Sequence, residues 1–300
     1  MAIKQSIQKY VRKSRFRQLK NYFYIMPALI FLFLFTIFPV FRSGYLSFFK
    51  TDPIFSFMDF VGLEHYKKMF HSSLFWEVSW NTFVYGMLQM LLSIVFGFLP
   101  ALMANSRRNK LKSLFKVSVF YPYILPWTVA AMVWMYILHP TRGILNTLLH
   151  SRVQWLNSYS LTLYVLVIIS TWKTAGLNFL LFLSGMQSIP EELYHAFWLE
   201  SKNKLQAVWY VTIPMLGPTT FVAALLTVIG SFQSVDLIYI LTQGRPGNST
   251  NTLIYYIYQE GITNWDIGYG SALSVFLFVC LFVFTIIYLS MEERNVNYDK

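Results

Sequence analysis

The sequence is poor in the residues that build metal centres and disulfide frameworks. Its 300 residues include one cysteine, and this Cys280 lies in an apolar stretch near the end of the chain. The chain therefore cannot form a disulfide framework or a cluster of thiol ligands. The histidines are scattered, which argues equally against a metal site: they are His65, His71, His139, His150 and His195.

The sequence also lacks the motifs of common catalytic sites. It has no GxxxxGK[ST], so the chain cannot hydrolyse a nucleoside triphosphate by the P-loop route. It has no soluble domain and no nucleophile paired with a base at a recognisable spacing. We therefore expect no enzymatic activity and no bound cofactor. If this protein transports a solute against its concentration gradient, we expect the energy to come from another protein.

Charged residues are scarce, and long apolar runs take their place. Hydrophobic residues make up 56% of the chain and charged residues 12%, outside the fractions usual for soluble domains. A nearly uncharged run of about 18 residues can cross the hydrocarbon core of a bilayer. The sequence predicts an all-α polytopic membrane protein with six transmembrane helices, at about Tyr22–Ser47, Thr82–Ala104, Leu114–Leu138, Leu161–Gly185, Ile213–Val235 and Gly268–Ser290.

Most of the net charge of +11 sits beside the predicted spans. The N-terminal tail, residues 1–21, is basic, and the second loop carries Arg107, Arg108, Lys110 and Lys112, whereas the first loop mixes both signs. Lysine and arginine mark the cytoplasmic side of membrane proteins. We therefore expect both termini in the cytoplasm, and a tail that contacts anionic headgroups rather than nucleic acid.

These features divide the chain into three parts. The basic tail is followed by a transmembrane domain, residues 22–290, and by a short cytoplasmic tail, residues 291–300. The first span has a long basic flank and no small-residue cleavage site after it, so we interpret it as a retained anchor rather than a signal peptide. The stretch between the first two spans, Phe60–Trp80, is expected to be an amphipathic loop.

Two prolines and one lysine lie inside the predicted spans. Pro122 and Pro126, in YPYILPW, predict a kink in the third span because each lacks a backbone donor. Lys173, in STWKTAGLNF, is costly at bilayer depth and should face the bundle interior or a wet cavity. We expect it to meet carbonyls, water or groups such as Asn178 and Gln233, because Asp236 lies about 18 Å away along the membrane normal. A role in a substrate pathway and a structural role both remain open.

One charged segment interrupts the apolar chain, at residues 188–212. In SIPE, Ser188 and Glu191 predict a capping box, with Pro190 in the first turn of a helix. The sequence IPEELYHAFWLESKNKLQAVW predicts two short helices joined by a turn on the cytoplasmic side. Its aromatic residues suit either an amphipathic hairpin in the lipid headgroups or a docking element for a cytoplasmic partner.

This segment resembles the EAA loop of permease subunits of binding-protein-dependent ABC importers of the carbohydrate type. The family pattern is approximately IP-x-E-L-Y-E-A-A-x-I-D-G-A followed by I-T-L-P-x-L-x-P. The chain matches this pattern at two groups of positions, which are Ile189, Pro190, Glu192, Leu193, Tyr194 and Ala196, and then Thr212, Ile213, Pro214, Leu216 and Pro218. The stretches FQSVDLIYILTQGRPGNSTNTLIYYIY and GYGSALSVFLF are similar to the family's last outer loop and last span.

The resemblance implies a function and a set of partners. The chain would be one of two permeases that move a carbohydrate, such as an oligosaccharide or a sugar derivative, into the cytoplasm by alternating access. A solute-binding protein would deliver the solute, and two separate ATPase subunits would bind ATP and Mg and drive the cycle. The ATPase contact would use Glu192, Tyr194, His195, Ala196, Phe197, Trp198, Glu200 and Ser201. Depth and side-chain chemistry suggest a substrate pathway along Trp172, Lys173, Asn178, Gln233 and Tyr239.

The chain departs from the family pattern at three places. His195, Ala196 and Phe197 stand where the family has Glu-Ala-Ala, and Glu200-Ser201 replaces Asp-Gly, where glycine would allow a positive φ. Arg245 replaces the second glycine of the outer-loop pattern. The alternative to an importer subunit is a self-sufficient secondary transporter or channel, which inverted repeats and paired broken helices would favour.

Overall fold

The computed structural model describes residues 24–51, 58–105, 112–201, 203–232 and 234–295, most of them in helices. The predicted all-α fold is confirmed, whereas the basic tail and Gln233 lie outside the described residues. Four single helices are long and apolar enough to cross a membrane: Tyr24–Leu46, which includes the π-helical turn η1 (Phe33–Ile37) and α2 (Phe38–Leu46), then α4 (Ser73–Asn105), α8 (Thr162–Ser188) and Ile267–Met291 of α15 (Ile267–Asn295).

Two further candidate spans are broken. The helices α5 (Lys112–Ile124) and α6 (Trp127–Ile137) meet at 102°. The predicted span Leu114–Leu138 thus consists of two helices, and the kink expected within it is confirmed. The break falls at Pro126, which lacks an N–H and keeps the preceding residue out of the α region. Pro122 stays inside α5.

The second break lies in the fifth predicted span. The segment from α10 (Lys204–Ala207) through η2 (Val208–Thr212) and α11 (Ile213–Met215) meets α12 (Gly217–Ser231) at 67°. The predicted fifth span, Ile213–Val235, was therefore too long at both ends. Ile213 precedes the bend, and Val235 begins a separate helix, α13 (Val235–Leu241). Counting each broken pair as one span gives the predicted six.

The remaining short elements lie between the spans. The stretch Phe60–Trp80 was expected to be a loop, but it holds α3 (Glu64–His71) and the first turns of α4. An unforeseen hairpin pairs β1 (Phe49–Thr51) with β2 (Met58–Phe60) in antiparallel register. The other short elements are α7 (Ile144–Leu148), α14 (Leu253–Tyr258) and the π-helical turn η3 (Gln259–Thr263).

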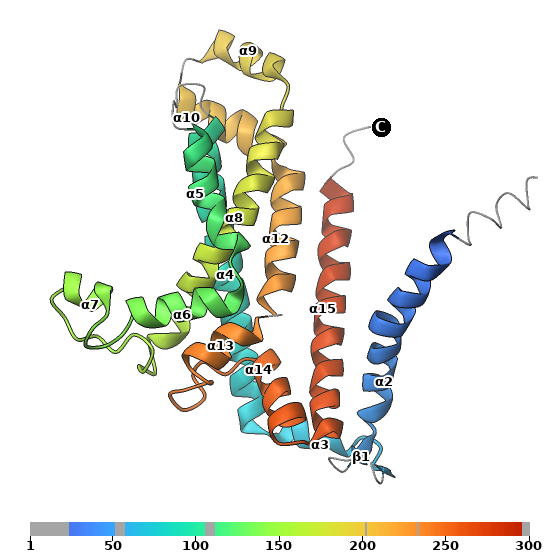
Figure 1. The fold of residues 1–300 in the computed structure, drawn as a ribbon. Helices are drawn as coiled ribbons and strands as arrows, with labels where there is room; N and C mark the ends of the chain where they lie inside the picture. The colour runs from blue at the N-terminus through green and yellow to red at the C-terminus, as the bar shows by residue number, and fades with distance from the viewer. Residues whose placement is uncertain (1–23, 52–57, 106–111, 202, 233, 296–300) are drawn as a thin grey trace, which may run out of the picture.

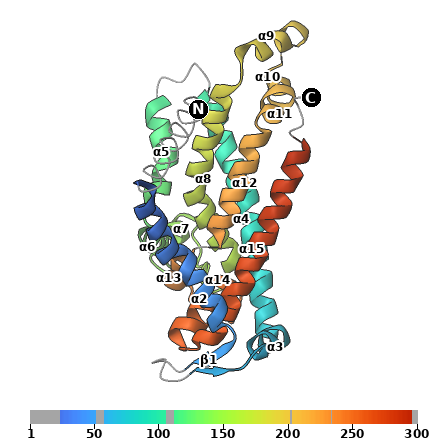
Figure 2. The same ribbon diagram turned by 90° about the vertical axis from the view of Figure 1, so that its right-hand side faces the viewer.

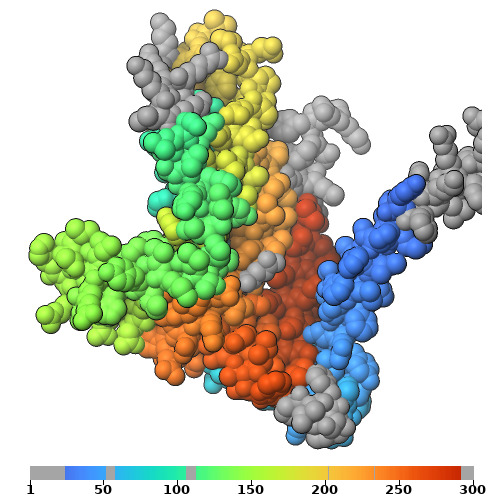
Figure 3. Space-filling view, in the orientation of Figure 1, coloured from blue at the N-terminus to red at the C-terminus, as the bar shows by residue number. Residues whose placement is uncertain are grey.

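The molecule has two distinct ends (Figures 1 and 2). The short helix α9 (Glu191–Glu200) and α10 lie at one end, which we call the α9 end, and β1 and α3 lie at the other, the hairpin end. The Tyr24 end of the first span and the Asn295 end of α15 point toward the α9 end (Figure 1). The first span contacts α15 near the hairpin end and then leans away from it (Figure 3).

The centre of the bundle is the pair α4 and α8. Helix α8 also packs against α5 and α12. A Cβ atom on Gly97 of α4 would lie 2.6 Å from the Cβ of Asn178 and 3.0 Å from its backbone carbon. Glycine therefore allows the two helices to touch backbone to side chain at this crossing.

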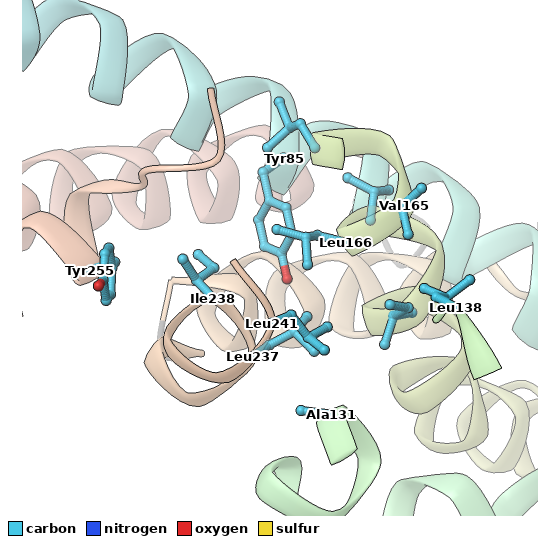
Figure 4. Close-up of a cluster of buried hydrophobic side chains, with 12 residues drawn as sticks. Tyr85, Ala131, Leu138, Val165, Leu166, Leu237, Ile238, Leu241 and Tyr255 are labelled. Atoms are coloured by element: carbon cyan, nitrogen blue, oxygen red, sulfur yellow. The ribbon is translucent and has the colours of Figure 1, made fainter. Parts of the chain in front are cut away.

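Three buried clusters hold the helices together. One joins α4, α6, α8 and α13, and in it the Tyr85 side chain points toward Leu237 and Leu241 (Figure 4). The second lies toward the α9 end and includes Phe179, Phe182 and Leu216. The third joins α3, α4, α14 and α15 near the hairpin end.

Candidate functional site

The charged segment that interrupts the apolar chain forms α9, outside the bundle. Helix α8 ends at Ser188, Ile189 is extended, and α9 starts at Glu191 after Pro190. The predicted capping box is wrong: Ser188 Oγ donates to the Gly185 carbonyl at 2.8 Å, and Pro190 is the N-cap residue. Because α8 continues through Ser188, the chain can turn only at the Ile-Pro step that follows. Glu191 and the next residue, also glutamate, lie in the first turn of α9 and complement its dipole.

One face of α9 is seated on the bundle. Tyr194 reaches the Thr212 hydroxyl with an O–O distance of 3.0 Å and packs against the buried cluster at the α9 end. Phe197 and Trp198 are half-buried, with ring centroids 5.8 Å apart. Tyr194 therefore contacts this chain itself rather than an outside surface.

The other face of α9 is open. Leu199 is 89% exposed and Leu193 40% exposed. The remaining exposed residues of this face belong to the predicted coupling set: Glu192, His195, Ala196 and Glu200. The outward face of α9 therefore combines exposed leucines with neighbouring carboxylates.

The turn after α9 needs no glycine. Ser201 adopts φ −143° and ψ 140°, which is extended backbone, so a side chain at this position carries no penalty. Its hydroxyl donates to Gln206 Oε1 at 2.6 Å. Asn203 then caps α10 by accepting from the Leu205 N–H at 3.0 Å. The two predicted short helices are confirmed. The turn between them uses an extended Ser201, where the family pattern has a glycine.

A pocket of about 460 Å³ lies beneath α9. It is bounded by the last residue of α4 (Asn105), the end of α8 and one side of α9. Tyr194, His195 and Trp198 all line it.

Lys173 forms a hydrogen bond at the break in the third span. Its side chain is buried, and Nζ donates to the Tyr123 carbonyl at 3.0 Å. Nζ also lies 4.8 Å from the Trp127 ring centroid. Tyr123 is in the last turn of α5, where carbonyls lack partners within the helix. The carbonyl contact predicted from the sequence is confirmed, and within the described ranges Lys173 forms no ion pair.

Replacing Lys173 with methionine tests this role. We expect Lys173→Met to destabilise the extracted protein by about 1–3 kcal/mol, because the Tyr123 carbonyl at the end of α5 loses the donor that Lys173 supplies. Thermal unfolding in detergent measures the effect, with Lys173→Gln as the control that keeps a donor. Unchanged stability together with loss of transport would contradict the structural role and assign Lys173 to the pathway.

Asn178 and Trp172 take part in contacts between helices. Asn178 is fully buried and donates to Thr227 Oγ1 of α12 at 3.0 Å. Trp172 is half-buried against Trp134 of α6, at 5.6 Å between ring centroids. The structure thus brings neither side chain to an open surface. Tyr239 differs, because its side chain is 46% exposed and its ring centroid lies 5.5 Å from that of Tyr258.

Sequence reasoning missed a polar contact at the centre of the bundle. Ser93 of α4 and Thr174 of α8 share a hydrogen bond of 2.8 Å, and Gln89 donates to the same threonine hydroxyl at 3.5 Å. The signal was available, because Gln89 and Ser93 stand four residues apart on one helical face. Within the residues that the structure describes, no group of three potential metal ligands occurs.

Comparison with known sequences shows extensive similarity to transport proteins. Residues 78–296 match the family model described as binding-protein-dependent transport system inner membrane component. The sulfoquinovosyl glycerol transport system permease protein SmoG of Agrobacterium fabrum is 32% identical over 88% of this chain and 87% of its own length. The arabinooligosaccharides transport system permease protein AraP of Bacillus subtilis is 29% identical over 90% of this chain and 88% of its own.

Solved structures share the fold. A chain of a bacterial ABC transporter that imports the acidic polysaccharide alginate superposes with a TM-score of 0.82 at 21% identity, covering 96% of this chain and 99% of its own. A chain from the alginate transporter in complex with an alginate pentasaccharide-bound periplasmic protein gives 0.84 at 21% identity, covering 95% and 98%. At this identity the likeness concerns the arrangement of the helices.

Proposed function

Because the chain belongs to the family of binding-protein-dependent transport system inner membrane components, we propose that it is the permease subunit of an ATP-driven importer of a carbohydrate. A second permease completes the pathway, and two cytoplasmic ATPase subunits supply ATP hydrolysis with bound Mg. A solute-binding protein outside the cytoplasmic membrane delivers an oligosaccharide or a sugar derivative. Relatives named for arabinooligosaccharides and for trehalose and maltose support the solute class.

The observation that carries this proposal is the seating of α9. Its exposed face is free to enter a cleft of an ATPase subunit, while Tyr194 ties its other face to Thr212. Thr212 lies four residues before Leu216, where the chain bends by 67° into α12. A displacement of α9 is therefore passed through one hydrogen bond and one short rigid segment to a helix of the bundle.

This function fixes the orientation of the protein in the membrane. The α9 end is cytoplasmic, together with the Tyr24 end of the first span and the Asn295 end of α15. The basic second loop, which follows α4, supports the same side. The predicted three-part division of the chain is retained in this proposal, with residues 188–212 as the coupling loop.

The substrate pathway is proposed to run along α8 and α13. Tyr239 offers an exposed ring in this structure, while Trp172, Lys173 and Asn178 become accessible only when α5, α6 or α12 moves relative to α8. Alternating access supplies such a movement. Gln233, between α12 and α13 in sequence, belongs to the same proposed set.

Affinity purification from the native host tests the proposed function. The tagged chain, extracted in mild detergent, is expected to retain a second multispanning subunit and a subunit that contains GxxxxGK[ST], and to hydrolyse ATP. Purification of this chain alone, still able to move solute into vesicles without ATP, would contradict the proposal and favour a secondary transporter or channel.

A further inference from the structure

A rigid loop joins α13 to α14 near the hairpin end of the molecule. The Thr250 hydroxyl donates to the Arg245 carbonyl and lies within hydrogen-bond distance of the Thr242 hydroxyl, both at 2.9 Å. Asn81 of α4 donates to the Asn248 carbonyl at 2.8 Å. Gly244 has φ +79°, and a Cβ there would lie 3.3 Å from the Tyr255 ring. The backbone that carries Arg245 is therefore fixed by contacts on both sides.

Tyrosines gather around this loop. Tyr239 and Tyr258 meet edge to face, with ring centroids 5.5 Å apart, and Tyr255 and Tyr258 stack at 6.1 Å with an interplanar angle of 19°. Tyr255 is buried, Tyr258 is half-buried and Tyr239 is 46% exposed. The cluster thus forms a supported aromatic platform whose accessible ring is that of Tyr239.

Arg245 adds a positive charge to this platform. Its side chain is exposed, and among the described residues no carboxylate lies within ion-pair distance of it. Burial raises the pKa of Tyr255, and nearby Tyr239 and Tyr258 raise it further, whereas a hydrogen bond with Gln259 and the charge of Arg245 lower it. The Gly244 backbone lies against the Tyr255 ring, which stacks on Tyr258, so the residue that follows it, Arg245, stands beside the tyrosine cluster.

We propose that Arg245, with Tyr239 and Tyr258, forms an entry subsite for an acidic sugar. The apolar face of a sugar ring packs on an aromatic ring, and Tyr239 and Tyr258 also offer hydroxyls to the sugar. The planar guanidinium binds a carboxylate, sulfonate or phosphate ester through paired N–H donors. The inference rests on the proposed carbohydrate import and specifies the charge of the solute.

The size of the patch favours a small ligand over an acidic protein surface. A stable protein interface covers about 800 Å² on each partner, whereas this cluster exposes one tyrosine ring and one arginine. A sugar with one anionic group matches both in size.

Binding of two matched glycosides tests the subsite. The purified complex in nanodiscs is mixed with methyl β-D-glucuronide or methyl β-D-glucoside, and saturation-transfer NMR measures binding to the protein. We expect a several-fold stronger signal from the glucuronide, and about a tenfold loss of its affinity in Arg245→Gln. Arg152→Gln, which changes an exposed arginine next to α7, is the matched control and is expected to bind as the wild type does.

Three outcomes would overturn the inference. These are equal binding of the two glycosides, no binding of either, and a glucuronide signal unchanged in Arg245→Gln. A variant that instead loses capture of a solute-binding protein, with no glucuronide binding, would identify a protein contact. ATP hydrolysis by the same preparation distinguishes failure of the subsite from failure of the proposed function. An active ATPase without preference for the glucuronide rejects only the subsite. Absence of any ATPase subunit rejects the proposed function.

Discussion

Phe197→Asp is expected to abolish co-purification of the ATPase subunits while leaving membrane insertion intact. Phe197 is half-buried on α9 and stacks edge to face on Trp198. A carboxylate at a half-buried apolar position is disfavoured unless it is paired, so the charge would displace α9 from the bundle or disrupt a docked partner. Because 1.4 kcal/mol corresponds to a factor of ten in affinity, we expect at least a tenfold loss of captured ATPase.

Two matched variants make this result interpretable. Phe197→Leu keeps an apolar side chain and is expected to retain most of the captured ATPase. Leu148→Asp places the same charge on α7, far from α9 in sequence and space (Figure 1), and should change nothing. Wild-type levels of ATPase in the Phe197→Asp preparation would show that α9 is not the docking element.

Gly97→Ala is expected to destabilise the bundle by about 1–3 kcal/mol, the usual cost of overpacking a core. The added Cβ would lie 2.6 Å from the Asn178 Cβ and 3.0 Å from the backbone of the same residue. Backbone atoms cannot rotate away, so α4 and α8 must separate. The separation also disturbs the buried hydrogen bond between Asn178 and Thr227. Thermal unfolding of the extracted protein measures the loss.

The matched control for this variant is expected to change the stability of the protein in the opposite direction. Gly230 lies within α12, and a Cβ there would meet nothing within 4 Å. Gly230→Ala should therefore stabilise the protein by a few tenths of a kcal/mol to about 1 kcal/mol, through helix propensity alone. Equal unfolding temperatures for the two alanine variants would contradict the tight crossing of α4 and α8.

The sequence predicted the helices well where hydropathy alone decides the structure. The first, second, fourth and sixth spans were located correctly because each is a long, nearly uncharged run that must satisfy its backbone internally. The third was expected to kink, whereas the break in the fifth was not foreseen. Their breaks depend on which partner satisfies the freed backbone groups, as Lys173 does for Tyr123, and such partners are distant in sequence.

The candidate site was predictable in part. The segment around α9 was found because charges interrupt an apolar chain there, and its two helices follow from local residue preferences. The direction of Tyr194 was not predictable, because it depends on Thr212, eighteen residues later. Arg245 appeared only as a departure from a pattern, and its neighbours Tyr239 and Tyr258 come from helices whose packing no local rule describes.

Cross-linking from the exposed face of α9 tests the central claim most directly. The single native cysteine permits a clean design: Leu199→Cys and, as control, Leu148→Cys, each in a Cys280→Ser background. These leucines are 89% and 70% exposed, at α9 and α7 respectively. We predict that a thiol-directed cross-linker joins position 199, but not position 148, to a subunit containing GxxxxGK[ST]. Cross-linking at neither position, with position 199 labelled by a membrane-soluble maleimide, would contradict the account and place α9 on lipid.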